Sequence, residues 1–215
     1  MEAAHFTVAA ALRLGAKVCE PYPCICGSIQ DSLGLHALFC KRIPSFGRQS
    51  RHAAINDLIQ RGPAQGGCPA TREPAHLDRD NGKRVDGLTV MPFSMGKCAI
   101  WDFTCPDTFA RSYRNQVLSN PGGSAKEAER KKSNKYQKFS PEFLFMPVAV
   151  ETSGVFGETA LKFTKEIYNR VRRATGEVRS THFLRQRIAV EVPRGNARSI
   201  MSLVSIGSTT NWADA

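Results

Sequence analysis

The sequence predicts a mixed α/β domain with a sheet at its centre and helices on its flanks. Three observations support this fold class: segments with helical periodicity alternate with short β-rich segments, 41% of the 215 residues are hydrophobic, and no segment is repeated. A hydrophobic fraction of this size is sufficient for a buried core. A chain of this length forms one domain, or one domain with a small appendage.

The core elements are expected in the order helix, β-hairpin, helix, strand, helix and helix, behind a short N-terminal helix. The helical segments span residues 3–18, 51–61, 124–138, 157–173 and 181–190. The strand segments span residues 84–91, 97–105 and 143–150. Gly62 and Pro63 are expected to end the helix that begins at residue 51. The chain then divides into an N-terminal segment of residues 1–48, a core of residues 49–204, and a polar tail of residues 205–215 that is expected to fray.

The chain is strongly basic, with 30 lysine and arginine residues against 19 aspartate and glutamate residues and a formal net charge of +11. Such an excess indicates a polyanionic partner, and nucleic acid is the most plausible one. The alternative is a basic domain without such a partner. No apolar run reaches the roughly 18 residues of a membrane span, and the N-terminal segment lacks the basic region of a signal peptide. We therefore expect no membrane contact.

Seven cysteines without a secretory signal are expected to be reduced, and their odd number argues against a disulfide framework. Four side chains follow the pattern Cys-x-Cys-x9-His-x3-Cys, namely Cys24, Cys26, His36 and Cys40. Such a set can converge on a tetrahedral Zn²⁺ with a structural role, because four protein ligands leave no open position for chemistry. Cys19 is an alternative ligand. The alternative to a metal site is a group of buried thiols beside a hydrogen-bonded histidine.

Two carboxylates lie inside the expected β-hairpin, Asp86 in its first strand and Asp102 in its second. A carboxylate within an apolar strand is costly to bury without a partner. Two carboxylates that converge at one edge of a sheet can bind Mg²⁺, which polarises a phosphodiester and lowers the pKa of an attacking water. A nearby lysine can then stabilise the developing negative charge. The alternative is a pair of surface aspartates at strand ends.

The order of these motifs resembles the restriction-like endonuclease domain of non-LTR retrotransposons, which has the PD-(D/E)xK core. The resemblance covers roughly residues 20–190, and the ordered set is far more specific than any one of its members. The set consists of the Cys-x-Cys-Gly…His-x3-Cys knuckle, Arg51-His52-x3-Asn56, Lys83-Arg84-Val85-Asp86-Gly87, Trp101-Asp102-Phe103-Thr104 and Lys132-x2-Lys135-Tyr136.

The resemblance implies a restriction-endonuclease-like fold in which Asp86 and Asp102 bind Mg²⁺ or Mn²⁺. It also implies nicking of DNA, which exposes a 3′-hydroxyl that primes reverse transcription. The implied partners are DNA and either the RNA of the element or a separate reverse transcriptase. Location in the nucleus follows from this substrate. One rival is a catalytically silent nucleic-acid-binding protein derived from such an element, and another is a zinc-stabilised protein-interaction module.

Two positions depart from the family pattern. Val85 stands where the family has proline, which changes backbone stiffness more than chemistry. Thr104 stands where the Asp/Glu-x-Lys pattern has its lysine. In many members this lysine has moved to the following helix, so Lys135 is the first choice for it and Lys132 the second. The alternative for this helix is a solvated charged surface.

Further residues are candidates for secondary roles. The candidate DNA contacts are Arg51, His52, Asn56, Lys83, Arg84 and Tyr136, with capping or core packing as the alternative. Glu73 and Glu151 are candidate additional acids for the metal site, and exposed positions outside it are the alternative. A basic face on the last two helices would contact phosphates, or would simply be solvated; its residues are Arg170, Arg172, Arg173, Arg179, Arg185 and Arg187.

Overall fold

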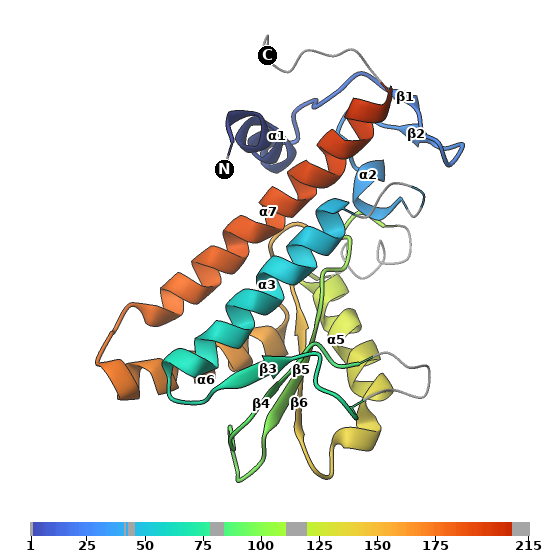
Figure 1. The fold of residues 1–215 in the computed structure, drawn as a ribbon. Helices are drawn as coiled ribbons and strands as arrows, with labels where there is room; N and C mark the ends of the chain where they lie inside the picture. The colour runs from blue at the N-terminus through green and yellow to red at the C-terminus, as the bar shows by residue number, and fades with distance from the viewer. Residues whose placement is uncertain (1, 41, 43–45, 78–83, 111–119, 208–215) are drawn as a thin grey trace.

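A four-stranded mixed sheet lies at the centre of the computed structural model, which describes residues 2–40, 42, 46–77, 84–110 and 120–207 (Figure 1). Its strands are β3 (Ala70–Arg72), β4 (Gly87–Thr89), β5 (Ala99–Thr104) and β6 (Leu144–Ala149), in that spatial order. β3, β4 and β5 are antiparallel neighbours, whereas β6 runs parallel to β5. Parallel neighbours need a long crossover connection, and helix α5 (Gly123–Lys135) provides it here.

Helices pack on both faces of this sheet. One face, with Trp101 of β5 at its centre, is covered by α3 (Phe46–Gln65), α6 (Glu158–Thr175) and α7 (Ser180–Gly207). Ile100 faces the other way and packs with Tyr136, which directly follows α5 and leads into the 3-10 helix η2 (Gln137–Phe139). This arrangement confirms the predicted α/β class with a mixed sheet flanked by helices.

The N-terminal segment packs on the C-terminal half of α7. It consists of helix α1 (Ala3–Leu14), a hairpin of β1 (Tyr22–Pro23) and β2 (Ile29–Gln30), and the short helix α2 (His36–Phe39). Val8 of α1 and Leu38 of α2 share an apolar cluster with Ala197 and Ile200 of α7. No helix within the described residues is long and apolar enough to cross a membrane.

Two helices are longer than the sequence predicts. α3 runs from Phe46 through Pro63 to Gln65, and α7 runs through Pro193 to Gly207. The physical reason is their mutual packing: a side chain at Gly195 would overlap Arg51, so the glycine permits a close approach of the two helices. Tertiary contacts along the whole length outweigh the proline and glycine signals that end an isolated helix. The predicted boundary between residues 48 and 49 therefore falls inside α3.

Other elements differ from the prediction mainly in their ends. α1 stops at Leu14, where Gly15 adopts a left-handed conformation (φ 66°) and caps the helix. β3 was absent from the sequence prediction, because three residues beyond a Gly- and Pro-rich stretch carry little periodicity. Of the predicted tail, residues 205–207 are helical and residues 208–215 lie outside the described part.

Gly87, the first residue of β4, lies directly against the indole of Trp101. A Cβ atom there would overlap the ring. We expect Gly87→Ala to lower the free energy of unfolding by about 1–3 kcal/mol, the usual cost of overpacking a core. Urea denaturation measures this change. Thr71→Ala, at an exposed position on β3, serves as the control and is expected to stay within about 0.5 kcal/mol of the unmodified chain.

Candidate functional site

The two aspartates come from neighbouring strands. Asp102 lies within β5, and Asp86 immediately precedes β4 rather than lying inside it. The backbone N–H of Asp86 donates to the carbonyl of Trp101 over 2.9 Å, and the backbone N–H of Phe103 donates to Asp86 Oδ2 over 2.6 Å. The backbone of β5 therefore positions the Asp86 carboxylate near Asp102, close enough for the negative charge of Asp86 to raise the pKa of Asp102.

Lys132 of α5 completes this group from the helix side. Its Nζ donates to Asp102 Oδ1 over 2.6 Å, and the two side chains are 22% and 7% exposed. Burial raises the pKa of Asp102 and the charge of Asp86 raises it further, while Lys132 and a hydrogen bond from Tyr136 lower it. The net pKa of Asp102 remains above its ordinary value. The positive charge of Lys132 therefore favours the ionised form of Asp102, which burial disfavours.

His52 of α3 contacts the other aspartate. Its Nε2 lies 3.2 Å from Asp86 Oδ2. Burial alone would raise the pKa of Asp86, but hydrogen bonds from His52, Phe103 N–H and Asn56 outweigh burial and lower it. Burial lowers the pKa of His52, but the hydrogen bond to Asp86 and the negative charges of Asp86 and Asp102 raise it. The pKa of His52 therefore lies above its ordinary value. The sequence revealed that His52 and Asn56 share a helix face, but it gave no signal that this face meets Asp86.

The structure distinguishes between the two candidate lysines. Lys132 forms the ion pair described above, whereas Lys135 is exposed. Among the described residues, no ion pair joins Lys135 to either aspartate. The geometry therefore favours Lys132, the second choice from the sequence, over Lys135.

Several candidate DNA contacts are buried. Arg51 is 4% exposed and donates to Asn196 Oδ1 on α7, and the side chains of Asn56 and Tyr136 are fully buried. The prediction that these three residues contact DNA does not fit their positions, because a duplex cannot reach them. His52 is partly exposed and Arg84 is exposed, so the prediction stands for both. Lys83 lies outside the described residues.

The two additional acids hold different positions: Glu151 is buried beside the start of α5, and the backbone N–H of Glu73 donates to the Asp86 carbonyl over 3.0 Å. Glu151 is 2% exposed and accepts the backbone N–H of Ala125 over 3.1 Å and the Ser153 hydroxyl over 2.9 Å. It therefore caps the N-terminus of α5. Glu73 is exposed and adopts a left-handed backbone conformation (φ 45°).

The arginines of the last two helices divide into two groups. Arg170 packs over the Phe93 ring, with its guanidinium carbon 4.7 Å from the ring centroid, and Arg185 donates to the Leu161 carbonyl over 2.7 Å. These two hold elements together. The remaining four are exposed and available to solvent or phosphate: Arg172, Arg173, Arg179 and Arg187.

The four predicted zinc ligands form a compact cluster. The ligand atoms of Cys24, Cys26, His36 and Cys40 all lie within 4.8 Å of one another. Cys24 Sγ lies 3.7 Å from Cys40 Sγ, and Cys26 Sγ lies 3.3 Å from His36 Nε2. This donor set can hold a metal ion. Cys19 instead donates its thiol to the Asp31 carbonyl over 3.4 Å and is not part of the cluster.

Local hydrogen bonds hold His36 in place and lower the pKa of Cys26. The Asp31 carboxylate accepts the backbone N–H groups of Leu35 and His36, over 3.3 and 3.1 Å, and so fixes the start of α2, which carries His36. Hydrogen bonds from Ser28 lower the pKa of Cys26 to about 6, whereas burial raises the pKa of Cys24 to about 11. A cation in the cluster would favour the thiolate of both, because thiolates are the ligands that metals bind.

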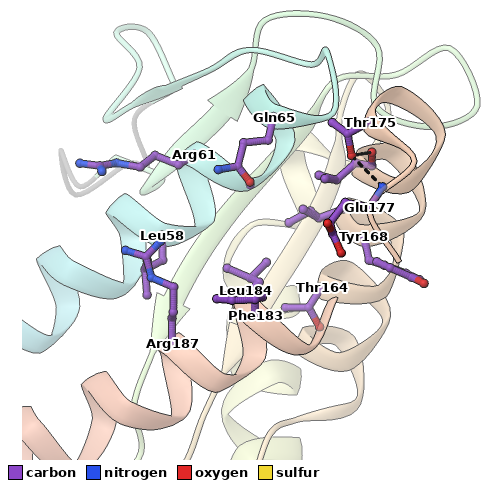
Figure 2. Close-up of a pocket in the computed structure, with 13 residues that line it drawn as sticks. Leu58, Arg61, Gln65, Thr164, Tyr168, Thr175, Glu177, Phe183, Leu184 and Arg187 are labelled. Carbon is purple, nitrogen blue, oxygen red and sulfur yellow. Dashed lines mark hydrogen bonds between the residues drawn. The ribbon is translucent and has the colours of Figure 1, made fainter. Parts of the chain in front are cut away.

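A groove of about 440 Å³ lies between α3, α6 and the start of α7 (Figure 2). Apolar side chains such as Leu58, Ile167 and Leu184 line it, and Arg61 and Arg187 also border it. None of the candidate catalytic or metal-binding residues lines this groove. The side chains that could hold a metal ion or take part in hydrolysis, those of the aspartate pair and Lys132, therefore lie outside this groove.

Comparison with protein-family models gives no match, and comparison with curated proteins gives none either. The function is therefore inferred from the side chains themselves.

Proposed function

We propose that this chain is a metal-dependent DNA endonuclease domain of the restriction-like type carried by non-LTR retrotransposons. The observation that carries the proposal is the convergence of Asp86, Asp102 and Lys132 from three separate elements. Two carboxylates beside a lysine are the minimal set for hydrolysis of a phosphodiester with a divalent cation. The mixed sheet flanked by helices is consistent with the PD-(D/E)xK core that the resemblance implies.

Each residue has a distinct role in this mechanism. Asp86 and Asp102 would hold Mg²⁺ or Mn²⁺, which supplies a water of lowered pKa and polarises the phosphodiester. Lys132, already hydrogen-bonded to Asp102, would orient that water or stabilise the charge that develops on the phosphate. His52 and Phe103 N–H hold the Asp86 carboxylate in place.

The partners follow from the same proposal. The net charge of +11 and the exposed arginines would supply phosphate contacts that set affinity rather than sequence choice. The nick would expose a 3′-hydroxyl that primes reverse transcription at the target site, with the RNA of the element or a separate reverse transcriptase as further partners. The nucleus would be the place of action. The Cys24, Cys26, His36 and Cys40 cluster would hold a structural Zn²⁺, because its four ligands leave no open position.

Incubation with supercoiled plasmid tests the proposal. We expect nicked circles in the presence of Mg²⁺ or Mn²⁺ and none after addition of a chelator. Absence of nicking under all these conditions would reject the enzymatic function.

A second candidate is a catalytically silent nucleic-acid-binding protein derived from such an element. The observation that favours it is the pairing of both carboxylates with side chains of the protein, Asp102 with Lys132 and Asp86 with His52. These pairs compete with a bound cation. DNA binding that persists without nicking would support this candidate.

The two lysines provide a matched pair of variants. We expect Lys132→Met to slow nicking by about a hundredfold, the usual effect of removing one group that stabilises transition-state charge. Lys135→Met removes the same charge from the exposed part of the same helix and is expected to change the rate by no more than about twofold. Initial rates of plasmid nicking measure both, with melting temperatures as the check on folding. Equal losses in the two variants would contradict the assignment of Lys132.

A further inference from the structure

The groove between α3, α6 and α7 has an apolar lining although it opens on the surface of the protein (Figure 2). Its aliphatic side chains are those of Leu58, Ile167, Val171 and Leu184, and the ring of Phe183, which also lines it, is 61% exposed. The volume of about 440 Å³ lies within the range of about 300–1,000 Å³ that is usual for binding pockets. An apolar hollow beside an exposed aromatic ring indicates an interaction surface.

The hydroxyl groups of the lining already have partners within the protein. Those of Tyr168, Thr175 and Thr164 donate to backbone carbonyls over 3.2, 2.7 and 2.8 Å. A nucleobase inserted into the groove would give up hydrogen bonds to water and find few replacements, which is costly. The inserted part of the occupant is therefore expected to be apolar.

The walls of the groove are helical. Apart from Glu177, every lining residue belongs to α3, α6 or α7. Away from the helix ends, the backbone N–H and C=O groups of these walls are paired within their own helices, so the groove offers no strand edge to an extended segment. A polypeptide that binds here must satisfy its own backbone groups, as an α-helix does.

The border of the groove is mainly basic. Figure 2 shows Arg187 beside Leu58 at one side of the groove, and Glu177, the one acidic residue of the lining, at the other. Within the described residues, no ion pair or hydrogen bond engages the Arg187 guanidinium. Arg172 and Arg173 add positive charge in the last turn of α6, and both are exposed. This surface is complementary to acidic side chains.

We propose that the groove is the docking site of a protein partner, which inserts the apolar face of an acidic amphipathic helix between α3, α6 and α7. Large apolar side chains three or four residues apart fill the groove, and a neighbouring carboxylate of the partner pairs with Arg187. Because none of the aspartates and lysines of the proposed active site lines the groove, this role does not depend on the proposed hydrolysis of DNA.

Selection of displayed peptides on the full chain tests the proposal. The library holds random peptides of about 16 residues, long enough for four turns of helix, after removal of those that bind an unrelated basic protein. We expect the enriched peptides to be acidic, to carry large apolar residues at helical spacing, and to gain helical circular dichroism signal on binding. Failure to enrich any peptide, or enrichment of sequences without this pattern, would overturn the proposal.

Titration of the strongest enriched peptide then locates its binding site. We expect Phe183→Glu to weaken binding about thirtyfold, the loss usual for an apolar anchor of an interface. Phe6→Glu makes the same change at a phenylalanine of α1 that is 65% exposed, and is expected to change the affinity by no more than about twofold. Melting temperatures check the folding of both variants. Equal affinities of the two variants would contradict the docking site.

Charge reversal tests the contact with Arg187. We expect Arg187→Glu to weaken binding about tenfold, because a favourable exposed pair becomes a repulsive one, and we expect recovery when one glutamate of the peptide is replaced by lysine. Lys126→Glu makes the same change of charge at an exposed position of α5, on the other face of the sheet, and is expected to have no more than about a twofold effect. Failure of every such lysine peptide to recover binding would overturn the pairing of Arg187 with a carboxylate.

Two other occupants of the groove give different results. Self-association of the chain that Phe183→Glu abolishes, measured by sedimentation velocity, would make the groove a contact between two copies. Weaker binding of a short single-stranded oligonucleotide by Phe183→Glu would make it a nucleic-acid site. Either result overturns the proposal. Plasmid nicking by Phe183→Glu is expected at the unmodified rate, and a chain that does not nick at all would reject the proposed function while the peptide titrations still decide the docking site.

Discussion

Asp86→Asn is expected to reduce plasmid nicking on the order of a thousandfold while leaving the fold intact. The neutral amide oxygen is a much weaker ligand for Mg²⁺ than a carboxylate, and a loss of about 4 kcal/mol of transition-state stabilisation corresponds to a factor of that size. The fold should survive because the amide oxygen can still accept hydrogen bonds from His52 and from Phe103 N–H. Asp102→Asn is expected to have a similar effect on the rate.

Asp57→Asn is the matched control for these variants. Like them, it removes one negative charge, in this case from α3. Asp57 pairs with Arg61 on the exposed side of that helix. Initial nicking rates and circular dichroism spectra should be compared for all three variants. If Asp86→Asn and Asp102→Asn nick as fast as the unmodified chain, the activity comes from a contaminant and the enzymatic proposal is wrong.

The sequence predicted the central strands well because their composition is distinctive. β5 reads Ala-Ile-Trp-Asp-Phe-Thr, and nearly every one of its side chains is buried. Asp102 is therefore conspicuous as the one charged residue of a buried strand. The N-terminal cluster was equally visible, because cysteine and histidine ligands at short spacings leave few other interpretations.

The features that the sequence could not predict depend on tertiary contacts. Lys132 and Lys135 are both compatible with a helix that faces the sheet, and only the packed structure shows that Lys132 shares the face of buried Ala125 and Tyr136. The length of α7 was hidden by Pro193 and Gly195, which end most helices. The contact of His52 with Asp86 joins α3 to the sheet across a long stretch of sequence, and no local pattern encodes it.

Cys40→Ser is expected to remove bound zinc and to lower the stability of the chain. Cys40 is 3% exposed and lies 3.7 Å from Cys24 within the four-ligand cluster. A ligand present at about a thousand times its dissociation constant stabilises a protein by about 4 kcal/mol, so loss of a structural Zn²⁺ should cost at least this much. The effect should reach α7, because Ala197 and Ile200 share the apolar cluster that surrounds the ligands.

Cys19→Ser is the control that distinguishes a zinc ligand from a thiol outside the cluster. Cys19 is a thiol of the same N-terminal segment as Cys40. Its thiol donates to the Asp31 carbonyl and lies outside the cluster. We expect zinc near one ion per chain in the unmodified protein and in Cys19→Ser, and almost none in Cys40→Ser, with a lower melting temperature only in the last. Loss of zinc from Cys19→Ser would instead make Cys19 a ligand. Zinc-free protein that melts at an unchanged temperature would mean that the four side chains are a packed thiol cluster without a structural ion.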